Sequence, residues 1–184
     1  MLAAASARDP LAFDLRATGV ALTGWRILNL LTRTATRSDA VVGTIDQTLA
    51  AAWSASARGV DLLRSALILC ADHELNVSSF TARCVASAGS NPYAVVMAGL
   101  AALEGTRHGG VSARVESMLE SMRRARHLPA AFGERLRRGE TIDGFGHPLY
   151  RNGDPRAAAL LDLLRDRYAK SAELAFVLDV AGAA

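Results

Sequence analysis

Three histidines of this sequence lie in segments whose composition differs from that of ordinary helix ends. His147 lies in GFGHPLYRNGDPRA (residues 144–157), His108 in RHGGVS and His73 in CADHELN. A neutral imidazole donates a hydrogen bond from one ring nitrogen and accepts one at the other. Such a donor stabilises the negative charge that develops on a carbonyl oxygen during a reaction. Histidine is thus a residue type that can take part in carbonyl chemistry, provided that the surrounding elements position it.

His108 stands directly before a predicted helix start, next to Gly109 and Gly110. The positive end of a helix dipole disfavours imidazolium, so we expect this ring to stay neutral and to donate to a carbonyl that becomes an enolate. The two glycines allow the backbone to approach a ligand closely. Ordinary helix–loop–helix chemistry explains them equally well.

His147 follows two glycines and precedes a helix that is predicted to begin with Asp154 as its N-cap and a proline as its first residue. Arg156 lies in the first turn of this helix, where its positive charge opposes the helix dipole. A bound anion, such as a carboxylate, would remove this conflict by accepting hydrogen bonds from the arginine and from the free N–H groups. We therefore predict an anion site beside His147.

His73 follows the most apolar helical segment and lies between Asp72 and Glu74. Taken alone, a histidine in this setting is more often a hydrogen-bonded structural residue than a ligand. The stretch HELNV lacks the second histidine of the HExxH motif, so no metal site is predicted. His127 resembles a solvated residue at a helix end and carries no functional hypothesis.

Hydrophobic periodicity predicts an all-α fold, because no stretch alternates with a period of two for long enough to form a sheet. Residues 66–70 are apolar on all sides, which predicts a buried helix. Cys70 and Cys84 are expected to be reduced core residues rather than a disulfide or reactive thiols. Ser78 or Ser79 is expected to cap the next helix. The predicted helices cover residues 14–37, 38–53, 57–76, 78–88, 92–104, 111–126 and 129–138, and two more start near 155 and 169.

The composition, 51% hydrophobic and 21% charged, is that of a globular protein that we expect to be soluble and cytoplasmic. The longest apolar run, Ala94 to Leu103, is too short for a membrane span, and the start MLAAASARDP lacks the pattern of a signal peptide. The excess of 21 Lys and Arg over 18 Asp and Glu suits anionic ligands but does not indicate nucleic-acid binding. The basic residues within 123–138 are interpreted as a solvated helix face, with a phosphate-binding patch as the alternative.

The histidine segments together resemble the citrate synthase family. LCADHELNVSSFTARCVASAGSNPYAVVMAGLAALEGTRHGG (residues 69–110) follows the family's DHE-N-S segment through its HGG turn, and GFGHPLYRNGDPRA resembles its GxGHxxYRxxDPRA loop. The match extends over about residues 60 to 165. The resemblance implies a multi-helical large domain (1–108) and part of a small helical domain (109–184), in a homodimer with its site in the cleft.

The resemblance also implies an acyltransferase that condenses acetyl-CoA, or another short acyl-CoA, with oxaloacetate and hydrolyses the thioester, with no metal or redox cofactor. His73 and Arg156 would hold the carboxylates of oxaloacetate. His108 would donate to the thioester oxygen as the enol forms, and His147 would polarise the ketone under attack. The loop of residues 142–146 would contact the adenine of CoA with its backbone. The expected CoA contacts are Ile142, Gly144, Phe145 and Gly146.

Residues 1–184 depart from the family pattern at the general base. The family's catalytic aspartate and a further substrate arginine lie in a C-terminal segment ending in a GWxAH-like pattern, which this sequence does not contain. Asp143 and Asp154 lie near the loop, but neither is expected to replace that base, since Asp154 is needed as a cap. Smaller departures at Ser112, Pro148 and Leu149 leave the acyl-CoA preference open.

Two alternatives to the enzyme follow from the sequence. One is a catalytically impaired fragment or regulatory module that binds oxaloacetate and CoA, indicated by the missing aspartate motif. The other is a helical dimerisation scaffold, indicated by the alanine-rich segments 50–71 and 85–103, whose small residues allow helices to approach closely.

Overall fold

The computed structural model describes residues 1–71, 75–147 and 149–184, and within these ranges the chain is built of helices without a strand. The predicted all-α fold is confirmed. The chain forms two compact units, Met1–Glu104 and Gly105–Ala184, which meet within the predicted break at GTRHGG. Their assignment to a large and a small domain stays a prediction. No helix in the described ranges combines the length and the apolar character that a membrane span needs.

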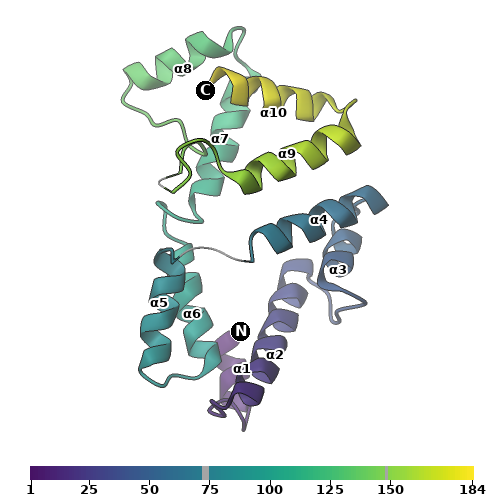
Figure 1. Ribbon diagram of the computed structural model, residues 1–184, viewed down its shortest axis with the longest axis vertical. Coiled ribbons are helices and arrows are strands. Elements are labelled where there is room, and N and C mark those ends of the chain that lie inside the picture. The colour runs from purple at the N-terminus through teal and green to yellow at the C-terminus, as the bar shows by residue number, and fades with distance from the viewer. Residues whose placement is uncertain (72–74, 148) are drawn as a thin grey trace. The chain divides into compact units, whose positions relative to one another are not determined.

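The first unit contains six of the helices in the described part of the chain (Figure 1). They are α1 (Leu2–Arg8), α2 (Ala17–Thr36), α3 (Ile45–Ala52), α4 (Ala57–Leu69), α5 (Val77–Ser87) and α6 (Pro92–Leu103). The second unit follows with α7 (Val111–Arg123), α8 (Leu128–Arg137), α9 (Pro155–Tyr168) and α10 (Ala172–Ala183).

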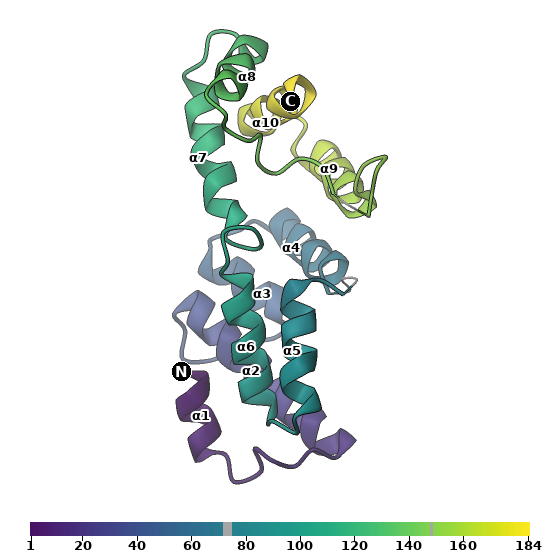
Figure 2. The same cartoon turned by 90° about the vertical axis from the view of Figure 1, so that its left-hand side faces the viewer.

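In the first unit, α5 and α6 form a close helical hairpin, and Figure 2 shows them side by side. A Cβ atom placed on Gly99 of α6 would lie 3.6 Å from the Cβ of Ala82 on α5, which is ordinary van der Waals contact. Small residues therefore do allow these two helices to approach closely. Asn91 caps α6, because its side chain accepts a hydrogen bond from the N–H of Ala94 at 3.0 Å, and Pro92 is the first helical residue as predicted.

The second unit has its own apolar core, to which α7, α8 and α10 contribute. Met118 and Met122 of α7 are 1% and 2% exposed, so the face of the helix that carries them points into the core. They pack with Phe132 of α8 and Val180 of α10. Ile142, in the loop after α8, packs against the edge of this core and so ties the loop to it.

Two predictions about helix starts are wrong. Helix α5 begins after Asn76, whose side chain accepts a hydrogen bond from the N–H of Ser79 at 2.8 Å, so Ser78 and Ser79 are inside the helix and do not cap it. Helix α3 begins after Thr44 rather than near residue 38, in a capping box in which the side chain of Gln47 accepts from the Thr44 N–H at 3.0 Å. In both places another polar residue, Asn76 or Thr44, is the N-cap instead of the predicted serine.

The predicted burial of the middle of α4 is also wrong. Leu67 and Ile68 are 43% and 66% exposed, because α4 packs against α3 on one side and leaves the other side uncovered within the described chain. Cys70, which ends α4, and Cys84 of α5 are exposed free thiols instead of core residues. An apolar helix surface predicts that a partner is needed, but it does not say that the partner lies within the same unit.

Candidate functional site

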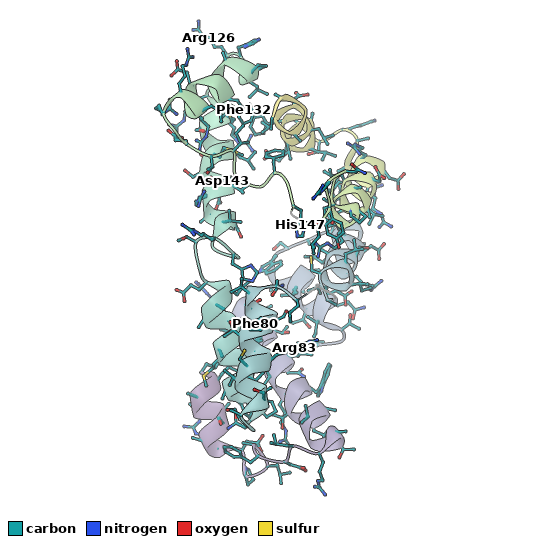
Figure 3. All side chains as sticks on the ribbon, turned by 60° about the vertical axis from the view of Figure 1, so that its left-hand side comes forward. Phe80, Arg83, Arg126, Phe132, Asp143 and His147 are labelled. Carbon is teal, nitrogen blue, oxygen red and sulfur yellow. The ribbon has the colours of Figure 1, made fainter. Side chains whose placement is uncertain are left out.

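His147 is held in a defined orientation by the backbone that follows it. The N–H of Leu149 donates to Nδ1 of His147 at 3.2 Å, and the N–H of Tyr150 donates to its carbonyl oxygen, also at 3.2 Å. Because Nδ1 accepts a hydrogen bond, the proton of the neutral ring is on Nε2. The imidazole therefore presents an Nε2–H donor. Figure 3 shows His147 on the segment that leads into α9.

The ring of Tyr150 connects His147 with Arg156. The centroids of the Tyr150 and His147 rings are 4.8 Å apart with their planes tilted by 38°, a favourable aromatic arrangement. The Cζ atom of Arg156 lies 5.3 Å from the centroid of the Tyr150 ring, within the range of a cation–π contact. The tyrosine thus holds the predicted donor and the predicted carboxylate ligand in one cluster.

Asp154 caps α9 and binds the guanidinium of Arg156. Its Oδ1 accepts from the Arg156 N–H at 2.9 Å, and the Arg156 Nη2 donates to its Oδ2 at 2.7 Å. These hydrogen bonds and the positive charge of Arg156 outweigh the effect of burial and lower the pKa of Asp154 to about 2. The idea that Arg156 needs an external anion to offset the helix dipole is therefore wrong, because the capping aspartate supplies the negative charge. The predicted role of Arg156 in substrate binding stays a prediction.

The loop before His147 is fastened to α7 by an ion pair. Asp143, which is 8% exposed, accepts from Nε of Arg114 at 3.2 Å, and its Oδ1 also accepts from Nη2 of Arg114. The hydroxyl of Thr141 donates to the same Oδ1 at 2.9 Å. Burial raises the pKa of Asp143, but the hydrogen bonds from Arg114 and Thr141 and the charge of Arg114 outweigh it, so the pKa is lowered overall.

Two glycines of this loop adopt conformations that other residues rarely take. Gly144 has φ +88° and Gly146 has φ +79°, both in the left-handed region. A Cβ on Gly144 would lie 3.0 Å from Cγ2 of Val115 on α7, whereas a Cβ on Gly146 would meet no atom within 4 Å. Phe145 between them is 44% exposed. The loop therefore touches α7 at Gly144 and turns outward beyond it.

His108 lies in the turn that starts α7. The residue is partly buried. Its backbone N–H donates to the carbonyl oxygen of Gly105 at 2.9 Å, and its backbone carbonyl oxygen accepts from the N–H of Val111 at 3.1 Å. Gly110, the N-cap, has φ −61° and ψ −11°, an ordinary right-handed conformation, so the freedom of glycine is not needed there for backbone geometry. His73 lies outside the described residues.

The basic residues of 123–138 are largely exposed and paired with acids. Arg137 and Arg138 both bind Glu134, and Arg138 also binds Glu140 at 2.6 Å. Arg137 and Arg138 therefore fit the interpretation as a solvated helix face, whereas the side chain of Arg135 is only 16% exposed and binds Glu140. The phosphate-binding alternative stays a prediction. His127 is exposed and caps α8, since its Nδ1 accepts from the N–H of Ala130 at 3.2 Å.

The structure brings together some of the predicted site residues within the second unit. His147 and Arg156 share a cluster with Tyr150 and Asp154, and the loop of residues 142–146 directly precedes it. Sequence reasoning missed Tyr150, which the YR pair of the motif indicated, and Arg114, for which no local signal exists. No group of three His, Cys, Asp or Glu residues in the described ranges is arranged to hold a metal ion.

Comparison with known proteins identifies the group to which these features correspond. Residues 22–183 match the family described as citrate synthase, C-terminal domain. Citrate synthase 2 of Bacillus subtilis (strain 168) is 40% identical over 104 residues, which are 56% of this chain and 28% of the relative. The crystal structure of citrate synthase from Thermotoga maritima MSB8 superposes with a TM-score of 0.65 at 24% identity, covering 81% of this chain and 43% of that one. The chain thus spans less than half the length of either relative, and the solved structure supports the fold.

Proposed function

This chain belongs to the citrate synthase family, and from that premise we propose that it acts in the condensation of oxaloacetate with acetyl-CoA, or another short acyl-CoA, followed by hydrolysis of the thioester. The observation that carries the proposal is that the family match over residues 22–183 includes His73, His108, His147 and Arg156. The whole reaction is a proposal, as are its substrates.

In the proposed reaction His147 polarises the ketone of oxaloacetate. Negative charge develops on the ketone oxygen as the new carbon–carbon bond forms, and a fixed donor stabilises that charge more than it stabilises the substrate. The Nε2–H of His147 is suited to this role because the Leu149 N–H fixes the tautomer at Nδ1. Tyr150 restrains the ring from the side.

Arg156 and His73 hold the two carboxylates of oxaloacetate in this proposal. Arginine binds carboxylates through a planar fork of N–H donors, which gives orientation as well as charge. Asp154 orients the Arg156 guanidinium through Nε and Nη2. His108 donates to the thioester oxygen of the acyl-CoA, and the loop of residues 142–146 receives the adenine of CoA. The reaction requires no metal or redox cofactor.

The proposed reaction also needs a general base that removes a proton from the acyl methyl group. The residues assigned to the site above do not include one. The carboxylates nearest to the loop, Asp143 and Asp154, are bound to Arg114 and Arg156, and both pKa values are lowered. A carboxylate with a lowered pKa is a weaker base, and proton removal from a methyl group needs a strong one. This favours a second candidate function, in which the chain binds oxaloacetate and CoA as a regulatory module without turnover.

Calorimetric titration separates the two functions. We expect the chain to bind oxaloacetate and then CoA, with Arg156→Gln and His147→Ala each weakening oxaloacetate binding. Arg137→Gln is the matched control, because Arg137 forms an exposed ion pair with Glu134 on α8. Thiol release from acetyl-CoA and oxaloacetate by the complete gene product supports the enzyme, and binding without release supports the module. A chain that binds neither ligand contradicts both.

A homodimer in the cytoplasm is part of the same proposal. Val77 and Phe80 lie three residues apart on α5, are 65% and 56% exposed, and therefore form an apolar strip on one face of that helix. A second copy of the chain is the partner that the family implies. Sedimentation equilibrium tests this: we expect a dimer, and we expect Phe80→Asp to shift the mass toward the monomer.

A further inference from the structure

The ion pair between Arg114 and Asp143 joins α7 to the loop that precedes His147. Arg114 is in the first turn of α7, where its positive charge opposes the helix dipole, so helix stability does not explain this residue. Its guanidinium donates to both oxygens of Asp143 and, at 2.9 Å, to the hydroxyl of Thr141. Two parallel hydrogen bonds of this kind fix direction as well as distance.

The same guanidinium also reaches the turn that contains His108. Nη1 of Arg114 lies 3.5 Å from the carbonyl oxygen of Thr106, two residues before His108. Arg114 therefore contacts both of the segments that carry the proposed catalytic histidines of this unit. These segments are far apart in sequence, and local backbone geometry alone does not fix their separation.

Side-chain packing leaves room beside this contact. A cleft of about 470 Å³ opens between α7 and residues 139–143, and Arg114, Met118 and Asp143 are among its lining residues. Because the two walls are not packed together along the cleft, the ion pair is a polar link across it, beside the apolar contacts of Ile142 and Gly144. Asp143 is buried, and its charge costs free energy if the arginine is removed.

The neighbouring residues show that the loop meets α7 in one register. Arg114 binds Asp143, and the next residue of α7, Val115, stands against the next residue of the loop, Gly144. A shift of the loop by one residue would break the ion pair and drive a side chain into Val115. The geometry thus selects one position for the residues that follow.

We infer that Arg114 is a positioning residue: it holds the loop of residues 142–146 on α7 in the conformation that receives CoA. The inference rests on the proposed function of that loop. In this inference Arg114 acts through Asp143, with which it forms the ion pair, and not by binding substrate itself. Its loss frees the loop while leaving the cluster of Tyr150, Asp154 and Arg156 in place, so the effect falls on CoA and not on oxaloacetate.

The test combines amide hydrogen exchange of the whole chain with calorimetry. For Arg114→Ala we expect exchange at residues 143–146 to become faster and CoA affinity to fall, each on the order of tenfold, with exchange at His147 and oxaloacetate affinity unchanged. Arg114→Lys keeps the charge without the fork and should lie between wild type and alanine. Arg137→Ala, which removes an exposed pair with Glu134, is the matched control and should change neither quantity.

Asp143→Asn provides a second route to the same result, because it removes the charge with little change of shape. Exchange at the core residues Met118 and Val180 reports whether a variant is still folded. Unchanged exchange at residues 143–146 in both variants overturns the inference, as does a loosened loop with wild-type CoA affinity. Failure of the proposed function gives a different result: the wild-type chain then binds no CoA, while hydrogen exchange at the loop still becomes faster in Arg114→Ala.

Discussion

Replacement of Gly144 by alanine tests how the loop of residues 142–146 is held against α7. Two costs add at this position. A residue with a side chain in the left-handed region costs about 1–2 kcal/mol, and Gly144 has φ +88°. The new Cβ would also lie 3.0 Å from Cγ2 of Val115, closer than side chains normally pack, and overpacking of this kind costs about 1–3 kcal/mol. We expect Gly144→Ala to lower the free energy of unfolding by about 2–5 kcal/mol.

Gly146→Ala is the matched control, because it places a side chain in the left-handed region without a close contact to another residue. Gly146 has φ +79°, and its Cβ would meet no atom within 4 Å. Its expected cost is about 1–2 kcal/mol. Urea denaturation followed by circular dichroism measures both variants. Val115→Ala in the Gly144→Ala background should recover the excess, since it removes the Cγ2 atom. Equal losses for the two glycine variants would refute the contact between the loop and α7.

Substitutions at three further positions test other parts of the second unit. Met118→Ala should lower the free energy of unfolding in urea by about 2–5 kcal/mol because it opens a cavity at a position that is 1% exposed, and Met118→Leu by less than about 1.5 kcal/mol; equal losses contradict the packing. The Asp154 carboxylate, with its pKa lowered from 3.8 to about 2, stabilises the fold above pH 3.8, and this contribution is lost as the pH falls through about 2. An acid titration should therefore show a smaller loss over that interval for Asp154→Asn than for wild type, and an identical loss argues against the ion pair. Tyr150→Ala should weaken oxaloacetate binding about fivefold in calorimetry and Tyr150→Phe should not, because the ring contacts His147 and Arg156; an equal effect of both points to the hydroxyl instead.

Most helices in the described part of this protein are predictable from sequence because their signals are local, although α1 (Leu2–Arg8) is not among the predicted ones. Pro92 after Asn91, and Pro155 after Asp154, start α6 and α9 as the pattern indicates. Cap choice is less predictable, since Asn76, Ser78 and Ser79 all have side chains that can accept a backbone hydrogen bond. At α5 the acceptor is Asn76, which receives the N–H of Ser79.

Burial was harder to predict than helicity, because burial depends on which elements meet. The apolar middle of α4 satisfies every local condition for a core helix, yet Ile68 is 66% exposed. Whether a partner covers that surface is not encoded in the period of the helix itself.

In the candidate site, too, features set by a short motif are predictable and contacts between distant segments are not. The cap formed by Asp154 and the cluster around His147 follow from a short motif and were foreseen in part. The pair of Arg114 and Asp143 spans 29 residues and depends on the fold of the whole unit, so no spacing rule points to it. The charge on Arg156 is balanced within the motif itself, because Asp154 pairs with its guanidinium.

The most direct measurement is nitrogen NMR of histidine-labelled chain during titration with oxaloacetate. The account predicts that free His147 carries its proton on Nε2 and that this nitrogen shifts as oxaloacetate binds, with no such shift in Arg156→Gln. A ring protonated on Nδ1 instead, or an Nε2 signal that stays unchanged at saturating oxaloacetate, would contradict it.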